Sequence, residues 1–199
     1  MCSSDLNVLF VMDSVTRFAM ASREIGLAAG EPPTVRGYPP SFFATLPRLL
    51  ERMGRTETGS ITGLLTVLLD ADDPNEPVAD TLRGLLDGHI FLSRELAERG
   101  HFPAVDIPAS LSRLMPDLVS SDHLESAARL REILSTWAEG RDLVEIGAYD
   151  PGSNPALDRA IEVVPLIERL TAQGRSESTS YEECVAAMHV LADLDGAEA

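Results

Sequence analysis

The sequence predicts an α/β fold with a mainly parallel sheet, followed by an all-helical part. Up to about residue 115, short apolar segments of strand type alternate with amphipathic segments of helical type. This alternation is typical of parallel strands connected by helices. Beyond that point no strand-like run remains, and long segments with helical periodicity follow. We therefore expect one domain over residues 7–115 and a helical domain over residues 116–199.

The α/β part should open with a buried strand over residues 7–12, because its apolar residues are continuous. Ser14 can cap a helix that ends near Ala29, where Gly30 provides a stop. The proline-rich stretch over 31–40 predicts a loop. The other elements expected in this part are a helix over 41–53 with Pro47 as its kink or first turn, strands over 60–69, 89–92 (also buried) and 105–107, and helices over 78–86 and 93–99.

The second part should consist of helices over 122–146, 154–172 and 180–194. Gly140 predicts a break in the first of them, and Pro165 an interruption of the second. Ser180 and Glu183 have the spacing of a capping box, which predicts the start of the last helix. Asp122 and Asn154 are the caps expected for the other two.

Charge and composition exclude several functions. The formal net charge is −16, which disfavours binding to nucleic acid or to anionic lipid. All 16 basic residues are arginine, so the chain contains no lysine for a phosphate loop of the G-x-x-x-x-G-K-[ST] type. The scattered histidines and the distant pair Cys2 and Cys184 predict no metal cluster and two free thiols in a reducing compartment.

Two acidic features could be functional, and each has a simpler interpretation. Asp13 directly follows the first strand, where an acid can face a metal ion, although such an acid more often caps the next helix. The loop DADDPNEP holds several carboxylates without the glycine and distal glutamate of a calcium loop. We interpret it as a solvated acidic turn that caps the following helix, with the acids Asp70, Asp72, Asp73 and Glu76.

Three long stretches together resemble the ATPases of the bacterial flagellar export apparatus, which are related to virulence type III secretion ATPases and to rotary ATP synthase catalytic subunits. They are MDSVTRFAMASREIGLAAGEPPTVRGYPPSFFATLPRLLERMG, GSITGLLTVLLDADDPNEPVADTLRGLLDGHIFLSRELAERGHFPAVDIPASLSRLMP and EIGAYDPGSNPALDRAI. The resemblance extends from Asn7 to about Leu194. It implies the C-terminal half of a RecA-like P-loop ATPase core, from the Walker B strand onward, with a helical domain behind it. Residues 1–6 do not match, and we expect them to be a non-native or mis-joined start.

The resemblance also implies roles for single residues. Asp13 matches the Walker B acid, which would hold Mg²⁺ through water. Phe102 matches the aromatic residue that stacks on the adenine of ATP. Arg113 matches the arginine finger that a neighbouring subunit supplies, a group worth about 10³–10⁵ in rate where it has been dissected. Arg17 matches an arginine beside the Walker B strand, a γ-phosphate sensor or interface residue.

The function implied is ATP hydrolysis by a homohexameric ring at the cytoplasmic face of the inner membrane, where it assists flagellar export. The partners implied are the export gate, stalk and regulator proteins, chaperones and export substrates. Because the Walker A loop and the catalytic glutamate are missing, we expect this chain to be inactive alone. Two alternatives stay open: a virulence secretion ATPase, and a non-catalytic fragment that binds stalk or chaperone. An RNA-translocating hexamer is disfavoured by the negative charge.

Overall fold

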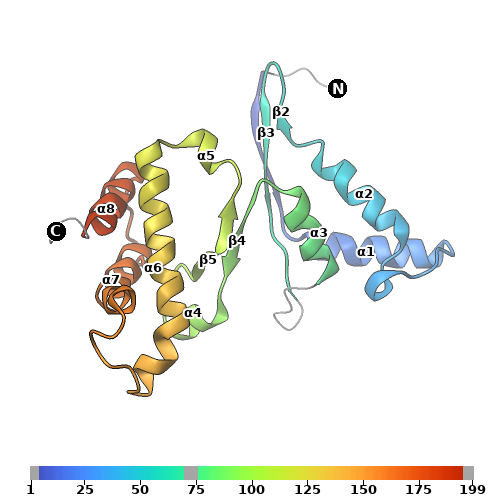
Figure 1. Cartoon of the computed structure of the whole chain (residues 1–199). Coiled ribbons are helices and arrows are strands. Elements are labelled where there is room, and N and C mark those ends of the chain that lie inside the picture. The colour runs from blue at the N-terminus through green and yellow to red at the C-terminus, as the bar shows by residue number, and fades with distance from the viewer. Residues whose placement is uncertain (1–4, 70–75, 195–199) are drawn as a thin grey trace. The chain divides into compact units, whose positions relative to one another are not determined.

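The computed structural model describes residues 5–69 and 76–194 (Figure 1). The chain divides into two compact units, Met1–Leu86 and Asp87–Ala199. This division precedes the change in sequence pattern near residue 116, because the last two strands pack with the helical part. Contacts between β5 (Val105–Ser112) and α6 (Ser121–Glu145) belong to the second unit. In the described residues, no helix is both long enough and apolar enough to cross a membrane.

The first unit contains a three-stranded sheet in the order β1-β3-β2, formed by β1 (Asn7–Met12), β2 (Gly54–Arg55) and β3 (Ser60–Leu65). β1 pairs with β3 in parallel, and β2 pairs with β3 antiparallel. The link between β2 and β3 is too short for the crossover that parallel pairing requires. β3 also ends earlier than the expected strand over 60–69, and Thr66 after it accepts a hydrogen bond from the amide of Val15, in the helix that follows β1.

The expected burial of the first strand is wrong. The apolar side chains of β1 remain accessible, for example Leu9 at 65% and Val11 at 57%. Helices of this unit pack against Met12 and Leu65, at the carboxyl ends of the strands, and not against the rest of the strand face. The buried core of this unit therefore packs at the end of the sheet at which Asp13 lies.

The core of the first unit lies between its helices α1 (Val15–Ala28), α2 (Pro40–Leu50) and α3 (Pro77–Leu85). Ser14 caps α1, and Gly30 follows its end with φ of 86°, both as predicted. Pro47 lies inside α2 and does not mark its first turn. The loop before α2 contains one 3-10 turn, η1 (Val35–Gly37). The buried side chains of this core are Val15, Ala19, Tyr38, Phe42, Leu46, Val78 and Leu82.

The second unit begins with an antiparallel pair, β4 (Gly88–Leu92) and β5 (Val105–Ser112), connected through the short helix α4 (Arg94–Glu98). β5 is longer than the predicted strand. Ile90 and Leu92 are each 70% exposed, so the prediction of a buried strand here is also wrong. The α/β class is confirmed, but among the described strands parallel pairing is limited to β1 with β3.

Helices α5 (Met115–Leu118), α6 (Ser121–Glu145), α7 (Pro155–Thr171) and α8 (Tyr181–Asp193) complete the second unit. The three long ones lie side by side (Figure 1) and enclose a second core. The predicted caps at Asn154 and Ser180 are confirmed, whereas Ser120 and not Asp122 caps α6. Pro165 lies within an uninterrupted α7. The buried residues of this core are Leu130, Ile133, Leu157, Ala160, Val163, Val164, Ile167 and Ala192.

The predicted break at Gly140 does not occur, because this glycine serves packing. α6 runs through it without interruption. A Cβ atom at this position would stand 2.5 Å from Cδ1 of Leu157 on α7. The absence of a side chain therefore lets α6 and α7 approach closely. Gly140 stabilises the packing of the two helices and does not break α6.

Candidate functional site

Asp13 lies at the carboxyl end of β1, directly before the cap of α1. Its side chain is exposed, and its Oδ1 accepts a hydrogen bond from Oγ1 of Thr66, at 2.7 Å. Thr66 directly follows β3, whose Leu65 is in register with Met12. Because parallel strands end at the same edge of a sheet, residues that are 53 positions apart in sequence meet here. The hydrogen bond fixes the orientation of a carboxylate that water can reach.

Backbone contacts hold this edge of the sheet rigidly. The amide of Thr66 donates to the carbonyl of Met12, at 3.0 Å, and the amide of Val15 donates to the carbonyl of Thr66, at 2.9 Å. The hydroxyl of Thr16 donates to the carbonyl of Leu68 and accepts from its amide. Since these bonds tie the first turn of α1 to the segment after β3, Asp13 stands between two fixed pieces of backbone.

Arg17 lies one turn into α1 from Asp13. Its amide donates to the capping hydroxyl of Ser14, and its side chain is exposed. The start of a helix carries partial positive charge from its backbone amides, which favours anions nearby. Asp13 and Arg17 therefore flank the same helix start, one with an acid and one with a guanidinium group.

The donor set at this site fits a magnesium ion that keeps most of its water. Mg²⁺ is usually held by one or two carboxylates, with several waters retained. The described residues contain no group of three or more histidine, cysteine, aspartate or glutamate side chains that could hold a metal directly. A single oriented and solvated carboxylate at Asp13 matches binding through water, and it does not match a cage made of protein ligands alone.

Phe102 and Arg113 lie in the second unit, at opposite ends of β5. Phe102 belongs to the loop between α4 and β5 and is 55% exposed. Arg113 follows the last residue of β5 and is also exposed, and its amide donates to the carbonyl of Asp87, at 2.8 Å. β5 contains a bulge, because its ends Val105 and Ser112 pair with Leu92 and Gly88 of the shorter β4, so the strand pair spans about 13 Å. Phe102 precedes one end of this strand in the chain and Arg113 follows the other.

The structure brings together Asp13 and Arg17 in one unit and places Phe102 and Arg113 in the other. Sequence reasoning missed Thr66, because the strand was expected to continue to residue 69. The available signal was a hydroxyl near the end of a second apolar strand, which in a parallel pair lies beside the acid of the first.

In the acidic loop, Glu76 caps α3 as predicted, with Oε2 2.9 Å from the amide of Ala79. Asp70, Asp72 and Asp73 lie outside the described residues.

A family model described as the ATP synthase alpha/beta family, nucleotide-binding domain, matches residues 1–112. The chain belongs to this family. A second model, the C-terminal domain of the type III secretion system ATPase EscN, matches residues 119–190. The two models meet near residue 116, where the sequence pattern changes. The predicted resemblance and the α/β-plus-helical fold class are thereby confirmed.

Relatives of known name agree with both models. The chain is 56% identical over 185 residues to the flagellum-specific ATP synthase of Bacillus subtilis, a match that covers 93% of this chain and 42% of the relative. It is 49% identical to the flagellum-specific ATP synthase of Salmonella typhimurium and to the type 3 secretion system ATPase of Xanthomonas euvesicatoria, with 41% and 42% of those relatives and 93% and 94% of this chain covered. The chain thus spans about two-fifths of the length of these relatives.

Solved structures lead to the same group of proteins. The assembled ATPase EscN of the enteropathogenic E. coli type III secretion system matches with a TM-score of 0.89 and 46% identity, over 93% of this chain and 45% of that one. EscN in complex with its central stalk EscO matches with a TM-score of 0.82 and 45% identity, over 93% of this chain and 44% of that one. At this identity the likeness extends to sequence as well as to fold.

Proposed function

We propose that this chain is part of an ATPase that assists protein export through a type III secretion apparatus of the flagellar kind. One observation carries the proposal: a nucleotide-binding model and a secretion-specific C-terminal model match consecutive parts of one chain. Residues 7–115 would belong to the nucleotide-binding domain and residues 116–199 to the C-terminal domain. The boundaries of the two models, at residues 112 and 119, support this assignment.

Each site residue would have a separate role in phosphoryl transfer. Asp13 would bind the waters of Mg²⁺, with Thr66 holding its carboxylate in place. Bound Mg²⁺ neutralises charge on the phosphate oxygens of ATP. Phe102 would stack on the adenine base through its exposed ring, and Arg17 would contact the γ-phosphate or a neighbouring subunit. No residue of this chain is assigned as the base that activates the attacking water.

Arg113 would act as an arginine finger in the pocket of a neighbouring subunit. A planar guanidinium group is suited to stabilise charge spread over phosphate oxygens. A finger supplied in trans requires a ring, and we propose a homohexamer. The solved structure of the related ATPase EscN is of an assembled form, which supports a ring.

The proposed partners are a stalk protein, the export gate and its regulator, chaperones and export substrates, and not nucleic acid. The complex of EscN with its central stalk supports the stalk as a partner. The formal charge of −16 disfavours a phosphate backbone as a ligand. The site of action would be the cytoplasmic face of the inner membrane, at the export apparatus.

A virulence-type secretion ATPase is the second candidate, because the Xanthomonas relative is 49% identical to this chain. The two candidates share their chemistry and differ in cargo. Replacing the matching segment of the Bacillus subtilis relative by residues 7–199 would give a chimaeric gene whose product can be tested in a strain that lacks that relative. We expect swimming motility to return. Failure to restore motility, together with restored secretion in a virulence system, would favour the second candidate.

The decisive biochemical test uses the same chimaera in purified form. We expect Mg²⁺-dependent ATP hydrolysis by the chimaera and none by the 199-residue chain, which lacks a phosphate-loop lysine. Turnover by the isolated chain would contradict our assignment of an incomplete site. A chimaera that folds and assembles but hydrolyses no ATP would contradict the assignment of this chain to an ATPase, and would favour a non-catalytic fragment that binds stalk or chaperone.

A further inference from the structure

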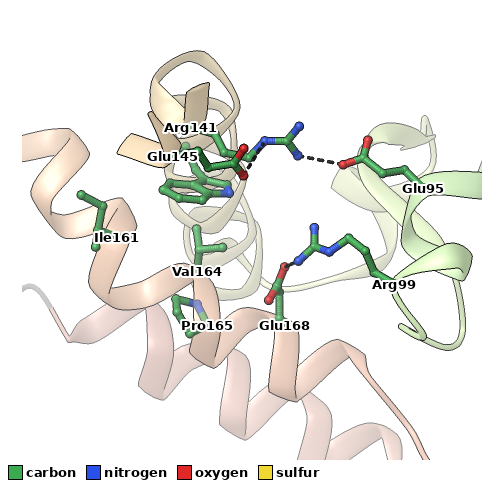
Figure 2. A pocket seen from close by; sticks show the side chains of 9 residues that line it. Glu95, Arg99, Arg141, Glu145, Ile161, Val164, Pro165 and Glu168 are labelled. Carbon is green, nitrogen blue, oxygen red and sulfur yellow. Dashed lines mark hydrogen bonds and ion pairs between the residues drawn. The ribbon is translucent and has the colours of Figure 1, made fainter. Parts of the chain in front are cut away.

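The loop that carries Phe102 is bonded to the C-terminal end of α7 at three points. The guanidinium of Arg99 contacts Oε1 of Glu168, at 2.9 Å between Nη2 and oxygen (Figure 2). Nε2 of His101 lies 3.3 Å from the hydroxyl of Thr171. The carbonyl of Phe102 accepts a hydrogen bond of 2.7 Å from the amide of residue 173. Three of the four residues from 99 to 102 thus contact the segment 168–173.

A second ion pair holds the helix that precedes this loop. Nη1 of Arg141 on α6 lies 2.9 Å from Oε1 of Glu95 on α4, and the Arg141 side chain also approaches Glu145 (Figure 2). Both ion pairs border a pocket of about 380 Å³ that Trp137 also lines. Both pairs are partly exposed to solvent, where a single ion pair adds little to stability by itself. Their significance lies in the segment that they hold.

The side chain of Phe102 does not fix its own position, because 55% of its surface is exposed. Within its own segment, the amide of Ser93 donates to the carbonyl of Ala104, at 2.8 Å, and the amide of His101 donates to the carbonyl of Leu96, at 2.9 Å. Residues 99–102 themselves contact the helical part at the end of α7. A ring that must stack on a base binds more tightly if its loop is ordered beforehand.

We propose that the end of α7 positions Phe102, so that Glu168 and Thr171 set the affinity of the site for the nucleotide base. This inference rests on the proposed function, in which Phe102 stacks on adenine. In this proposal Glu168 and Thr171, two residues of the helical part, are positioning residues for nucleotide binding and do not touch the nucleotide themselves. Because binding free energies are reciprocal, a partner that displaces α7 would change nucleotide affinity, and nucleotide would change the affinity for that partner.

The test compares kinetic constants of variants in the chimaera described above. We expect the double variant Glu168→Gln with Thr171→Val to raise KM for ATP about three- to tenfold, the range of one or two weak polar contacts, with kcat within about twofold. The reversed pair Arg99→Glu with Glu168→Arg should restore most of the affinity lost in Glu168→Arg alone. The matched control is Glu125→Gln, which removes an exposed ion pair with Arg129 on α6 that does not touch the loop. It should leave both constants unchanged.

Amide exchange in the 199-residue chain gives an independent measurement. In the double variant, the amide at residue 173 should lose protection, while amides in the middle of α7 keep theirs. Phe102→Ala separates the two proposals. If it leaves KM unchanged, the stacking role fails and this inference fails with it. If it raises KM while the double variant changes neither KM nor the exchange at residue 173, the positioning role alone is wrong.

Discussion

The hydroxyl of Thr66 donates a hydrogen bond of 2.7 Å to the carboxylate of Asp13, across the carboxyl ends of two parallel strands. The partner is supplied by a residue that is 53 positions further along the chain. An exposed carboxylate without such a bond would rotate among several orientations. The pairing of β1 with β3 therefore determines both where the acid stands and which way it points.

Loss of the hydrogen bond between Thr66 and Asp13 should lower the affinity of the site for Mg²⁺ without unfolding it. We expect Thr66→Val in the chimaera to lower Mg²⁺-dependent turnover about tenfold and to raise the Mg²⁺ concentration for half-maximal rate, as for other groups that orient a metal ligand. Thr66→Ser keeps the hydroxyl and should remain near the starting rate. Asp13→Asn should have the largest effect. The measurement is ATP hydrolysis as a function of Mg²⁺ concentration.

The control for this series is Thr62→Val, at an exposed threonine of β3, the strand that Thr66 follows, in register with Leu9. It makes the same chemical change away from the acid and should alter neither rate nor Mg²⁺ requirement. An Asp13→Asn variant with an unchanged Mg²⁺ requirement would exclude Asp13 from the metal site.

The arginine finger can be tested by mixing subunits. Arg113→Ala should abolish hydrolysis and leave nucleotide binding largely intact, because the finger stabilises the transition state. If it acts in trans, a mixture of Arg113→Ala and Asp13→Asn chimaeras should recover part of the activity. In a mixed ring, some pockets receive the intact acid from one subunit and the intact arginine from the other.

Two observations would contradict this assignment. One is hydrolysis at a near-normal rate in Arg113→Ala rings. The other is a mixture no more active than its components, although exchange of subunits is demonstrated by labelling. The control variant is Arg175→Ala, which removes an exposed arginine in the segment between α7 and α8 and should leave the rate unchanged.

Local signals in the sequence predicted most element boundaries, because caps and stops depend on neighbours in the chain. Ser14, Asn154 and the Ser180–Glu183 box are examples. Burial could not be predicted in this way, since it depends on what covers a strand. The continuous apolar run in β1 suggested a covered sheet, yet its side chains remain accessible in the described structure.

The site was predictable residue by residue only through resemblance. Spacing alone gives no reason to single out Phe102 or Arg113, because each lies in a loop with an ordinary structural interpretation. The hydrogen bond from Thr66 to Asp13 and the bonds between the Phe102 loop and α7 join residues about 50 to 70 positions apart. Such contacts depend on strand register and helix packing, which a single sequence does not specify.

Two helical glycines of this chain, Gly140 and Gly84, should respond in opposite ways to substitution by alanine. A Cβ at Gly140 would meet Leu157 of the second core at 2.5 Å, whereas a Cβ at Gly84 in α3 would meet nothing within 4 Å. Overpacking of a core costs about 1–3 kcal/mol, and replacing an exposed helical glycine by alanine gains about 0.5–1 kcal/mol. We expect Gly140→Ala to lower the free energy of unfolding and Gly84→Ala to raise it, as measured by urea denaturation. Equal effects of the two would contradict the close approach of α6 and α7.

The capping box of α8 makes a prediction about acid stability. Oε2 of Glu183 accepts a hydrogen bond of 2.9 Å from the amide of Ser180, whose hydroxyl accepts one from the amide of Glu183. The hydrogen bond from the Ser180 amide, and after it the Ser180 side chain, lower the pKa of Glu183 from its ordinary value of 4.5. A carboxylate with a lowered pKa stabilises the folded state at pH values above its ordinary pKa, and this contribution is lost as the pH falls through the lowered value.

We therefore expect the free energy of unfolding of wild type to exceed that of Glu183→Gln near neutral pH, and the difference to vanish in acid. Titration followed by carboxyl ¹³C NMR should place the pKa of Glu183 below its ordinary value of 4.5. A Glu183 carboxyl that titrates at its ordinary value would show that the box does not hold α8 in solution.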